Sequence, residues 1–116
     1  MTDKKIDSSN LSSPLGDRGI LNIGILGLGE GRSTMSAAIQ SEKVNLKMIC
    51  DQNLETCRQR ADEFKMYEYT TDYSEMLQDA EIDIIAIYTP DHLHAEHIKL
   101  ALQHDKHVVC TKPFID

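Results

Sequence analysis

Hydrophobic residues fall into two alternating patterns from residue 20 onward. Short, nearly continuous apolar runs predict strands buried on both faces, at 20–26, 44–50, 66–69, 82–89 and 107–110. Between them, apolar residues recur every three or four positions, which predicts amphipathic helices over 32–40, 54–65, 73–80 and 92–102. Strands that alternate with helices pair in parallel through right-handed crossovers. The pattern therefore predicts an α/β fold of Rossmann type, a doubly wound three-layer αβα sheet with strand order 3-2-1-4-5.

Particular residues mark where the predicted helices begin and which faces they bury. Asn53, Asp72 and Asp91 each precede a helix and are predicted N-caps, while Pro90 ends the strand before it. The predicted inner faces comprise Met35, Ala38 and Ile39; Leu54, Cys57, Ala61 and Phe64; Tyr73, Met76, Leu77 and Ala80; and Ala95, Ile98, Ala101 and Leu102.

Composition limits where the protein works and what it binds. Residues 1–19 read as a flexible polar tail before one domain at 20–116, and they lack the apolar core of a signal peptide. No apolar run is long enough to span a membrane. A net charge of −7 without a basic patch argues against nucleic acid. The three cysteines, Cys50, Cys57 and Cys110, are odd in number and form no C-x-x-C pair, which favours a reducing cytoplasm. Each is expected to pack in the core, with a reactive thiol as the alternative.

The candidate chemistry begins at a glycine-rich turn after the first strand. The stretch reads Gly27-Leu28-Gly29-Glu30-Gly31-Arg32, an imperfect G-x-G-x-x-G. Gly27 permits a tight turn, and Gly29 lets the backbone approach a pyrophosphate. The third position, which favours close helix–strand packing when it is Gly or Ala, is Arg32, with Gly31 one place early. The turn therefore predicts a phosphate site at the helix N-terminus, with an ordinary βα turn as the alternative.

The second strand ends in an acid that supports a dinucleotide site. Asp51 follows Gly27 by about two dozen positions, where an acidic residue binds the adenosine ribose, and Gln52 lies beside it. The alternative for Asp51 is a capping or solvated carboxylate. Arg32 has two open readings, a solvated residue of the first helical turn or a guanidinium over the pyrophosphate or adenine.

Two further strand ends are expected at the same sheet edge, because carboxyl ends of parallel strands meet there. They are Tyr88-Thr89-Pro90 and Thr111-Lys112-Pro113. The glycine turn and Asp51 would hold the adenosine half of the dinucleotide. These two segments would lie beside the nicotinamide half.

The histidines offer a metal site as a competing hypothesis. His92, His94 and His97 cluster at one helix start, but only His94 and His97 have a usable helical separation. No Cys or carboxylate completes a set at zinc spacing, so no metal is expected. His94 also precedes Ile98 by one helical turn, which makes a packed core histidine an alternative to a cofactor contact.

Two segments carry a family resemblance. They read Asp83-Ile84-Ile85-Ala86-Ile87-Tyr88-Thr89-Pro90-Asp91-His92-Leu93-His94-Ala95-Glu96 and Lys106-His107-Val108-Val109-Cys110-Thr111-Lys112-Pro113. From about residue 20 to 114 the chain resembles the N-terminal domain of the Gfo/Idh/MocA oxidoreductases, which include glucose–fructose oxidoreductase and inositol dehydrogenase. The matching positions are Asp91, His94, Lys112 and Pro113. Asp105 and Thr111 depart from the family's Gly and Glu.

The resemblance implies a function. The chain is expected to bind NAD, with NADP less favoured because Asp51 would repel a 2′-phosphate. The implied reaction is hydride transfer between nicotinamide and a sugar-like or cyclitol substrate, with Lys112 as the catalytic residue that assists proton transfer. His94 and Pro113 are expected at the cofactor. A non-catalytic NAD(P)-binding module is the alternative.

The resemblance also implies further partners. The family's second domain, which supplies the small-molecule pocket, is expected to be absent from these 116 residues. The strand at 107–110 would then be a sheet edge, so a homo-oligomer is expected.

Overall fold

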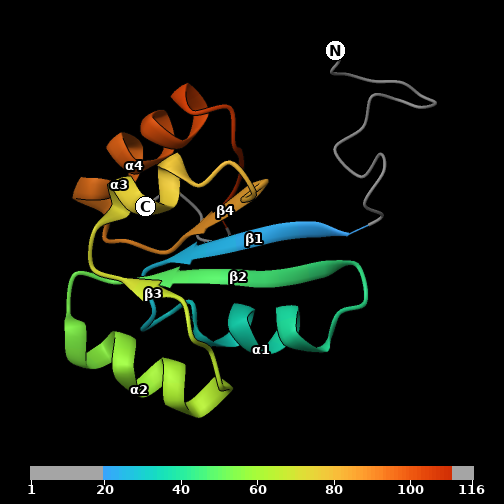
Figure 1. The fold of residues 1–116 in the computed structure, drawn as a ribbon. Helices are drawn as coiled ribbons and strands as arrows, with labels where there is room; N and C mark the ends of the chain where they lie inside the picture. Colours follow the sequence, from blue (N-terminus) through green and yellow to red (C-terminus); the bar gives the residue numbers. More distant parts are fainter. Residues whose placement is uncertain (1–19, 111–116) are drawn as a thin grey trace.

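The computed structural model describes residues 20–110, apart from the side chain of Asp91. In this range strands and helices alternate (Figure 1). The strands are β1 (Leu21–Leu26), β2 (Val44–Cys50), β3 (Tyr69–Thr70), β4 (Ile84–Ile87) and β5 (His107–Val109). The helices are α1 (Arg32–Gln40), α2 (Leu54–Phe64), α3 (Tyr73–Gln78) and α4 (Asp91–Gln103).

The sheet confirms the predicted topology. All four strand pairings are parallel, and the order is β3-β2-β1-β4-β5. Helices α1 and α2 cover one face of the sheet, and α3 and α4 cover the other (Figure 1). Order reverses between β1 and β4, so the carboxyl ends of these strands flank the crevice where such folds bind ligands.

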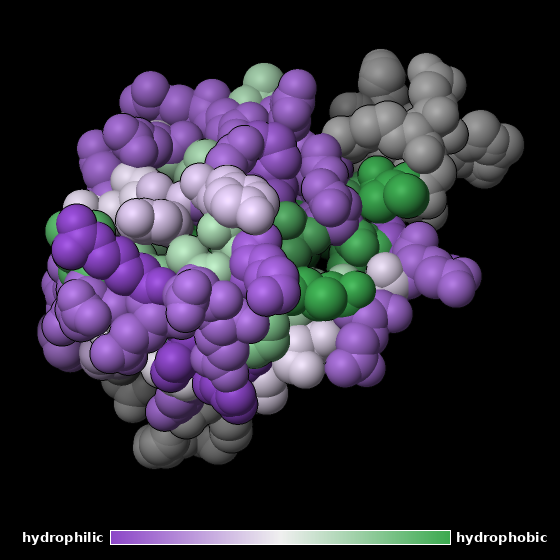
Figure 2. Space-filling view, turned by 60° about the horizontal axis from the view of Figure 1, so that its bottom comes forward, coloured by the Kyte–Doolittle hydropathy of each residue, from purple (hydrophilic) through white to green (hydrophobic). Residues whose placement is uncertain are grey.

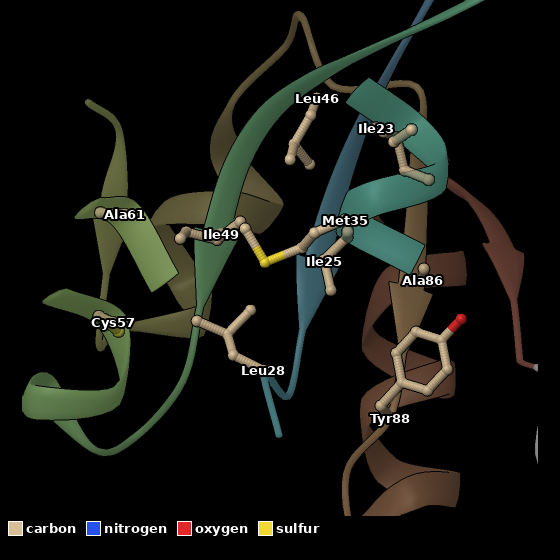
Figure 3. Packing of buried hydrophobic residues seen from close by; sticks show 11 residues of the cluster. Ile23, Ile25, Leu28, Met35, Leu46, Ile49, Cys57, Ala61, Ala86 and Tyr88 are labelled. Carbon is tan, nitrogen blue, oxygen red and sulfur yellow. The ribbon is translucent and has the colours of Figure 1, made fainter. Parts of the chain in front are cut away.

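Each face of the sheet has its own apolar core, because successive strand side chains point to opposite faces. On the α1–α2 face, Met35 reaches from α1 toward Ile25 of β1 and Ile49 of β2 (Figure 3). On the α3–α4 face, Met76 and Ala101 pack with the other side of the sheet. Burial on both faces explains why the strands are nearly continuous apolar runs.

A bulge in β2 explains why its side chains do not alternate strictly between the two faces of the sheet. Leu46 and Ile49 are three residues apart, yet both face the α1–α2 core. The β1–β2 register shifts there, since Ile23 pairs with Leu46 and Gly24 with Met48, which leaves Lys47 as an extra residue. The bulge moves the rest of β2 onto the opposite alternation.

Helix starts are predicted well and strand ends less well. Asn53 and Asp72 are N-caps, accepting hydrogen bonds from the N–H groups of Thr56 and Ser74 at 3.0 and 2.9 Å. The expectation for Asp91 is wrong: α4 begins there and its N-cap is Pro90. The strands predicted at 20–26, 66–69, 82–89 and 107–110 are observed at 21–26, 69–70, 84–87 and 107–109. Apolar runs extend past these ends because flanking loop residues also pack against the core.

The helices bury narrower faces than their periodicity predicts. Ile39, Leu54 and Leu102 are 47%, 45% and 57% exposed, and Ala80 and Ala95 are exposed as well, so these inner-face assignments are wrong. Leu54 and Leu102 lie in the first and last turns of their helices, and Ala80 lies beyond the end of α3. Most of the face shown in Figure 2 is nonetheless hydrophilic, with apolar residues gathered toward one side.

A buried lysine directly before β5 binds the loop between α3 and β4. Lys106 is 7% exposed, and its Nζ donates hydrogen bonds to the carbonyl oxygens of Asp79 and Ile82 at 2.7 and 2.9 Å. Burial lowers the pKa of this ammonium group, while Asp79 and other nearby carboxylates act in the opposite direction. The ammonium gives the Ile82 carbonyl a donor and adds a second donor to the Asp79 carbonyl, which also accepts the N–H of Ile82 at 3.1 Å.

Replacing this ammonium should destabilise the domain. We expect Lys106→Met to lower the free energy of unfolding by about 2 kcal/mol, because two buried carbonyls lose a charged donor. Lys99→Met, on the exposed side of α4, is the matched control and should change it by less than about 0.5 kcal/mol. Equal denaturation midpoints for the two variants would show that Lys106 does not support the loop.

Candidate functional site

The glycine turn is held against the end of β4. Gly27 has a φ of 92°, which confirms the predicted tight turn. A Cβ there would lie 2.9 Å from both the carbonyl carbon and the oxygen of Tyr88, so a side chain is excluded. At Gly29, by contrast, no atom lies within 4 Å of a Cβ position, and the backbone faces open space.

Close packing of α1 against β1 depends on Gly31, although the G-x-G-x-x-G fingerprint places this role at the position of Arg32. A Cβ on Gly31 would lie 2.4 Å from the Gly27 carbonyl oxygen and 2.9 Å from Cγ2 of Ile25. Gly31 is also the N-cap of α1, and its N–H donates to the Gly27 carbonyl at 3.2 Å. Arg32 at the third fingerprint position is thus compatible with close packing, because the contact occurs one residue earlier.

Asp51 joins the end of β2 to the same turn. Its Oδ2 accepts a hydrogen bond from the N–H of Leu28 at 2.9 Å, and its Oδ1 accepts one from Asn53 at 2.9 Å. The N–H of Gly27 donates to the Cys50 carbonyl oxygen, also at 2.9 Å. Asp51 therefore holds the backbone of the turn and of Asn53, while the N-cap of α2 is Asn53 itself.

Two arginines and a glutamate lie beside the turn. Arg32 forms an ion pair with Glu63 of α2, and its guanidinium lies 5.7 Å from the centre of the Phe64 ring. Arg60 donates from Nε to the carbonyl oxygen of Leu28 at 3.1 Å, and its Nη1 is 3.5 Å from Oε1 of Glu63. The hydrogen bond from Arg32 lowers the pKa of Glu63 and raises that of Arg32. Sequence reasoning missed Arg60, since one polar helical residue gives no motif.

The end of β4 carries a second set of polar contacts. Thr89 accepts a hydrogen bond at its carbonyl oxygen from Nδ1 of His94 (3.1 Å), and its Oγ1 is 2.9 Å from Nδ1 of His97. The hydroxyl of Tyr73 donates to the His97 carbonyl at 2.8 Å, and the two rings meet edge to face. The hydroxyl of Tyr88 bonds that of Thr34 on α1. His94 is 5% exposed, which fits the packed histidine.

These elements surround a cleft of about 720 Å³ at the carboxyl ends of β1, β2 and β4. Eight of the predicted site residues line it: Gly27, Gly29, Glu30, Asp51, Gln52, Tyr88, Thr89 and Pro90. Six further residues line the cleft that no sequence motif indicated: Leu26, Cys50, Thr71, Tyr73, Leu93 and His97. Tyr73 was expected only as core, and His97 only as a metal ligand.

The remaining predicted residues lie behind the cleft or outside the described range. Leu28, Gly31 and His94 are buried next to the lining, and Arg32 points to Glu63. Lys112 and Pro113 lie outside the described residues. Of the four strand ends expected at this edge, those of β1, β2 and β4 meet at the cleft.

The cleft has little reactive character of its own. Burial raises the pKa of the Cys50 thiol to about 12, so it stays protonated and unreactive. Burial, followed by the influence of His94, lowers the pKa of His97, which favours the neutral imidazole. The lining residues include the acids Glu30 and Asp51 but, within residues 20–110, no lysine or arginine.

Other kinds of site find no support within residues 20–110. No three His, Cys, Asp or Glu side chains of this range gather where they could hold a metal ion. No helix in the range is both long and apolar enough to cross a bilayer.

The family model described as an oxidoreductase family with an NAD-binding Rossmann fold, Gfo/Idh/MocA, matches residues 21–116. This chain belongs to that family. The matched model is that of an NAD-binding domain, and the strand order of the sheet is that of a Rossmann fold.

Named relatives of this NAD-binding domain are dehydrogenases. Levoglucosan dehydrogenase of Pseudarthrobacter phenanthrenivorans is 31% identical over 102 residues, which cover 80% of this chain and 26% of that protein. D-glucoside 3-dehydrogenase of Escherichia coli is 27% identical over 108 residues, covering 91% and 29% respectively. The chain thus spans less than a third of the length of these relatives.

Solved structures agree on the fold. Scyllo-inositol dehydrogenase from Lactobacillus casei superposes with a TM-score of 0.71 at 28% identity, covering 81% of this chain and 28% of that one. A levoglucosan dehydrogenase in complex with NADH and levoglucosan superposes with a TM-score of 0.68 at 29% identity, covering 78% and 27%.

The two glycines that flank Glu30 should respond differently to alanine. We expect Gly31→Ala to lower the free energy of unfolding by about 2 kcal/mol or more, because its Cβ would overlap the Gly27 carbonyl. Gly29→Ala, whose Cβ meets no atom, should stay within about 0.5 kcal/mol of the parent. Chemical denaturation measures both, and a Gly31→Ala protein as stable as the parent would contradict the packing described.

Proposed function

We propose that residues 20–116 form the cofactor-binding domain of an NAD-dependent dehydrogenase that acts on a sugar-like or cyclitol substrate. The observation that carries the proposal is the junction of Gly27, Asp51 and Thr89 around one cleft. Bound NAD would accept or donate the hydride, and the protein would position it. The names of the dehydrogenase relatives support the substrate class.

The adenosine half of the cofactor would lie at the β1 and β2 side of the cleft. The open face of Gly29 leaves room for the pyrophosphate beside the N-terminus of α1, which favours negative charge. Each carboxylate oxygen of Asp51 accepts one backbone N–H and retains capacity for a ribose hydroxyl. Asp51 would therefore both fix the glycine turn and bind the ribose.

The nicotinamide half would lie at the end of β4. Thr89 and His97 are fixed there by their mutual hydrogen bond, and Tyr73 fixes the backbone of His97. These groups would orient the ring and narrow the space for water. Lys112 and Pro113 follow β5, which pairs beside β4, so they would approach from the same edge. Lys112 would then assist proton transfer at the substrate.

The substrate pocket is proposed to come mainly from a second domain, as the resemblance implies. β5 is an edge strand of the sheet within the described residues, which supports a homo-oligomer. Free Cys50, Cys57 and Cys110 support a reducing, cytoplasmic location. Thr111 in place of the family's Glu favours a second candidate, a module that binds NAD without turnover.

Binding of NADH should depend on the open face of Gly29. We expect Gly29→Val to weaken NADH binding at least tenfold while preserving the fold, because the branched side chain would occupy the space of the pyrophosphate. The measurement is the change in NADH fluorescence on titration with protein. Ala37→Val, on the exposed side of α1, is the control. Undiminished binding by the folded Gly29→Val protein would refute this placement.

The parent protein should prefer NADH over NADPH by about tenfold. A 2′-phosphate next to the Asp51 carboxylate would bring like charges together, and about 1.4 kcal/mol of residual repulsion corresponds to that ratio. Parallel titrations with the two nucleotides measure it. Equal or tighter NADPH binding would show that nearby arginines outweigh the carboxylate.

A further inference from the structure

Arg32 and Arg60 approach the dinucleotide site from its outer side but are both engaged by one carboxylate. Arg32 is the first residue of α1, directly after the glycine turn, and it forms an ion pair with Glu63. Arg60 is one helical turn before the end of α2, and its Nη1 lies 3.5 Å from the other oxygen of Glu63. Glu63 thus joins the two helices and neutralises part of the local positive charge.

Arg60 and Asp51, the carboxylate that would receive the ribose, both bind the backbone of Leu28. Asp51 accepts the N–H of Leu28, and Arg60 donates to the carbonyl of the same residue. The two charged groups therefore bind opposite polar groups of a single residue. Nε of Arg60 donates to Leu28, so the terminal nitrogens are the part of this guanidinium that faces Glu63 or could bind another anion.

We propose that Glu63 is a specificity-determining residue, which keeps Arg32 and Arg60 from binding a 2′-phosphate and so preserves the preference for NAD. This inference rests on the proposed function. A guanidinium binds phosphate through forked hydrogen bonds, and two of them at the ribose would offset the repulsion from Asp51. Glu63 opposes this by pairing with one terminal nitrogen of each guanidinium and by adding its own negative charge. It would act through the arginines and without contact to the cofactor.

The expected size of the effect follows from simple electrostatics. A unit negative charge about 6 Å from a phosphate dianion in water-like surroundings changes its affinity by at most about tenfold, and salt reduces this. Arginine nitrogens released from Glu63 would also strengthen binding of the phosphate. Glu63→Gln, which keeps the shape and removes the charge, should therefore shift the affinity ratio toward NADPH by roughly three- to tenfold.

Asp62→Asn provides a matched control. Asp62 is the neighbouring exposed acid of α2, and it forms no ion pair with any residue in the range 20–110. Its substitution removes the same formal charge from the same helical turn without releasing an arginine. Dissociation constants for NADH and NADPH are measured for the full 116-residue chain, both variants and the double variant Glu63→Gln/Arg60→Met. Circular dichroism verifies that each is folded.

The proposal expects a shifted ratio in Glu63→Gln, a ratio near that of the parent in Asp62→Asn, and loss of most of the shift in the double variant. An unchanged ratio in Glu63→Gln, or equal shifts in both single variants, would overturn this inference alone. If the folded parent bound neither nucleotide, the proposed function would fail and this inference with it.

Discussion

The contact between the glycine turn and the end of β4 is the constraint on which the site depends. Gly27 passes so near the Tyr88 backbone that no side chain fits between them, and Gly31 brings α1 equally close to the turn. Asp51 then fixes the turn from the β2 side through the N–H of Leu28. The position of the cleft follows, because three strand ends are held together at the point where sheet order reverses. The polar contacts of Thr89 extend the same rigid edge toward α4.

The cationic side chains have different partners at the two ends of the sheet. At the ligand end, Glu63 pairs with Arg32 and Arg60, and the cleft lining within residues 20–110 includes neither arginine. At the opposite end, Lys106 is buried on backbone carbonyls, and Lys47 pairs with Asp79 at 2.9 Å. The first arrangement joins α1 to α2 beside the turn, whereas the second supports the loop that leads into β4.

Sequence periodicity predicted the order of strands and helices because burial on both faces imposes it. It did not predict the bulge at Lys47 or the exposure of Leu102, since these depend on how much sheet each element meets. Among site residues, Gly27 and Asp51 were recognisable from spacing along the chain. The packing role of Gly31 and the places of Arg60 and His97 were not, because they arise from contacts between elements that no local pattern encodes.

The most direct test of this account is an amide spectrum of the isotope-labelled protein during titration with NADH. The account predicts the largest shift changes at Gly29, at Asp51 and at Thr89, the three positions where strand ends meet the cleft. The hollow on the outer side of α4, lined by Ala95 and Leu102 among others, should show none. Changes confined to that hollow, with the glycine turn unaffected, would contradict the central claim.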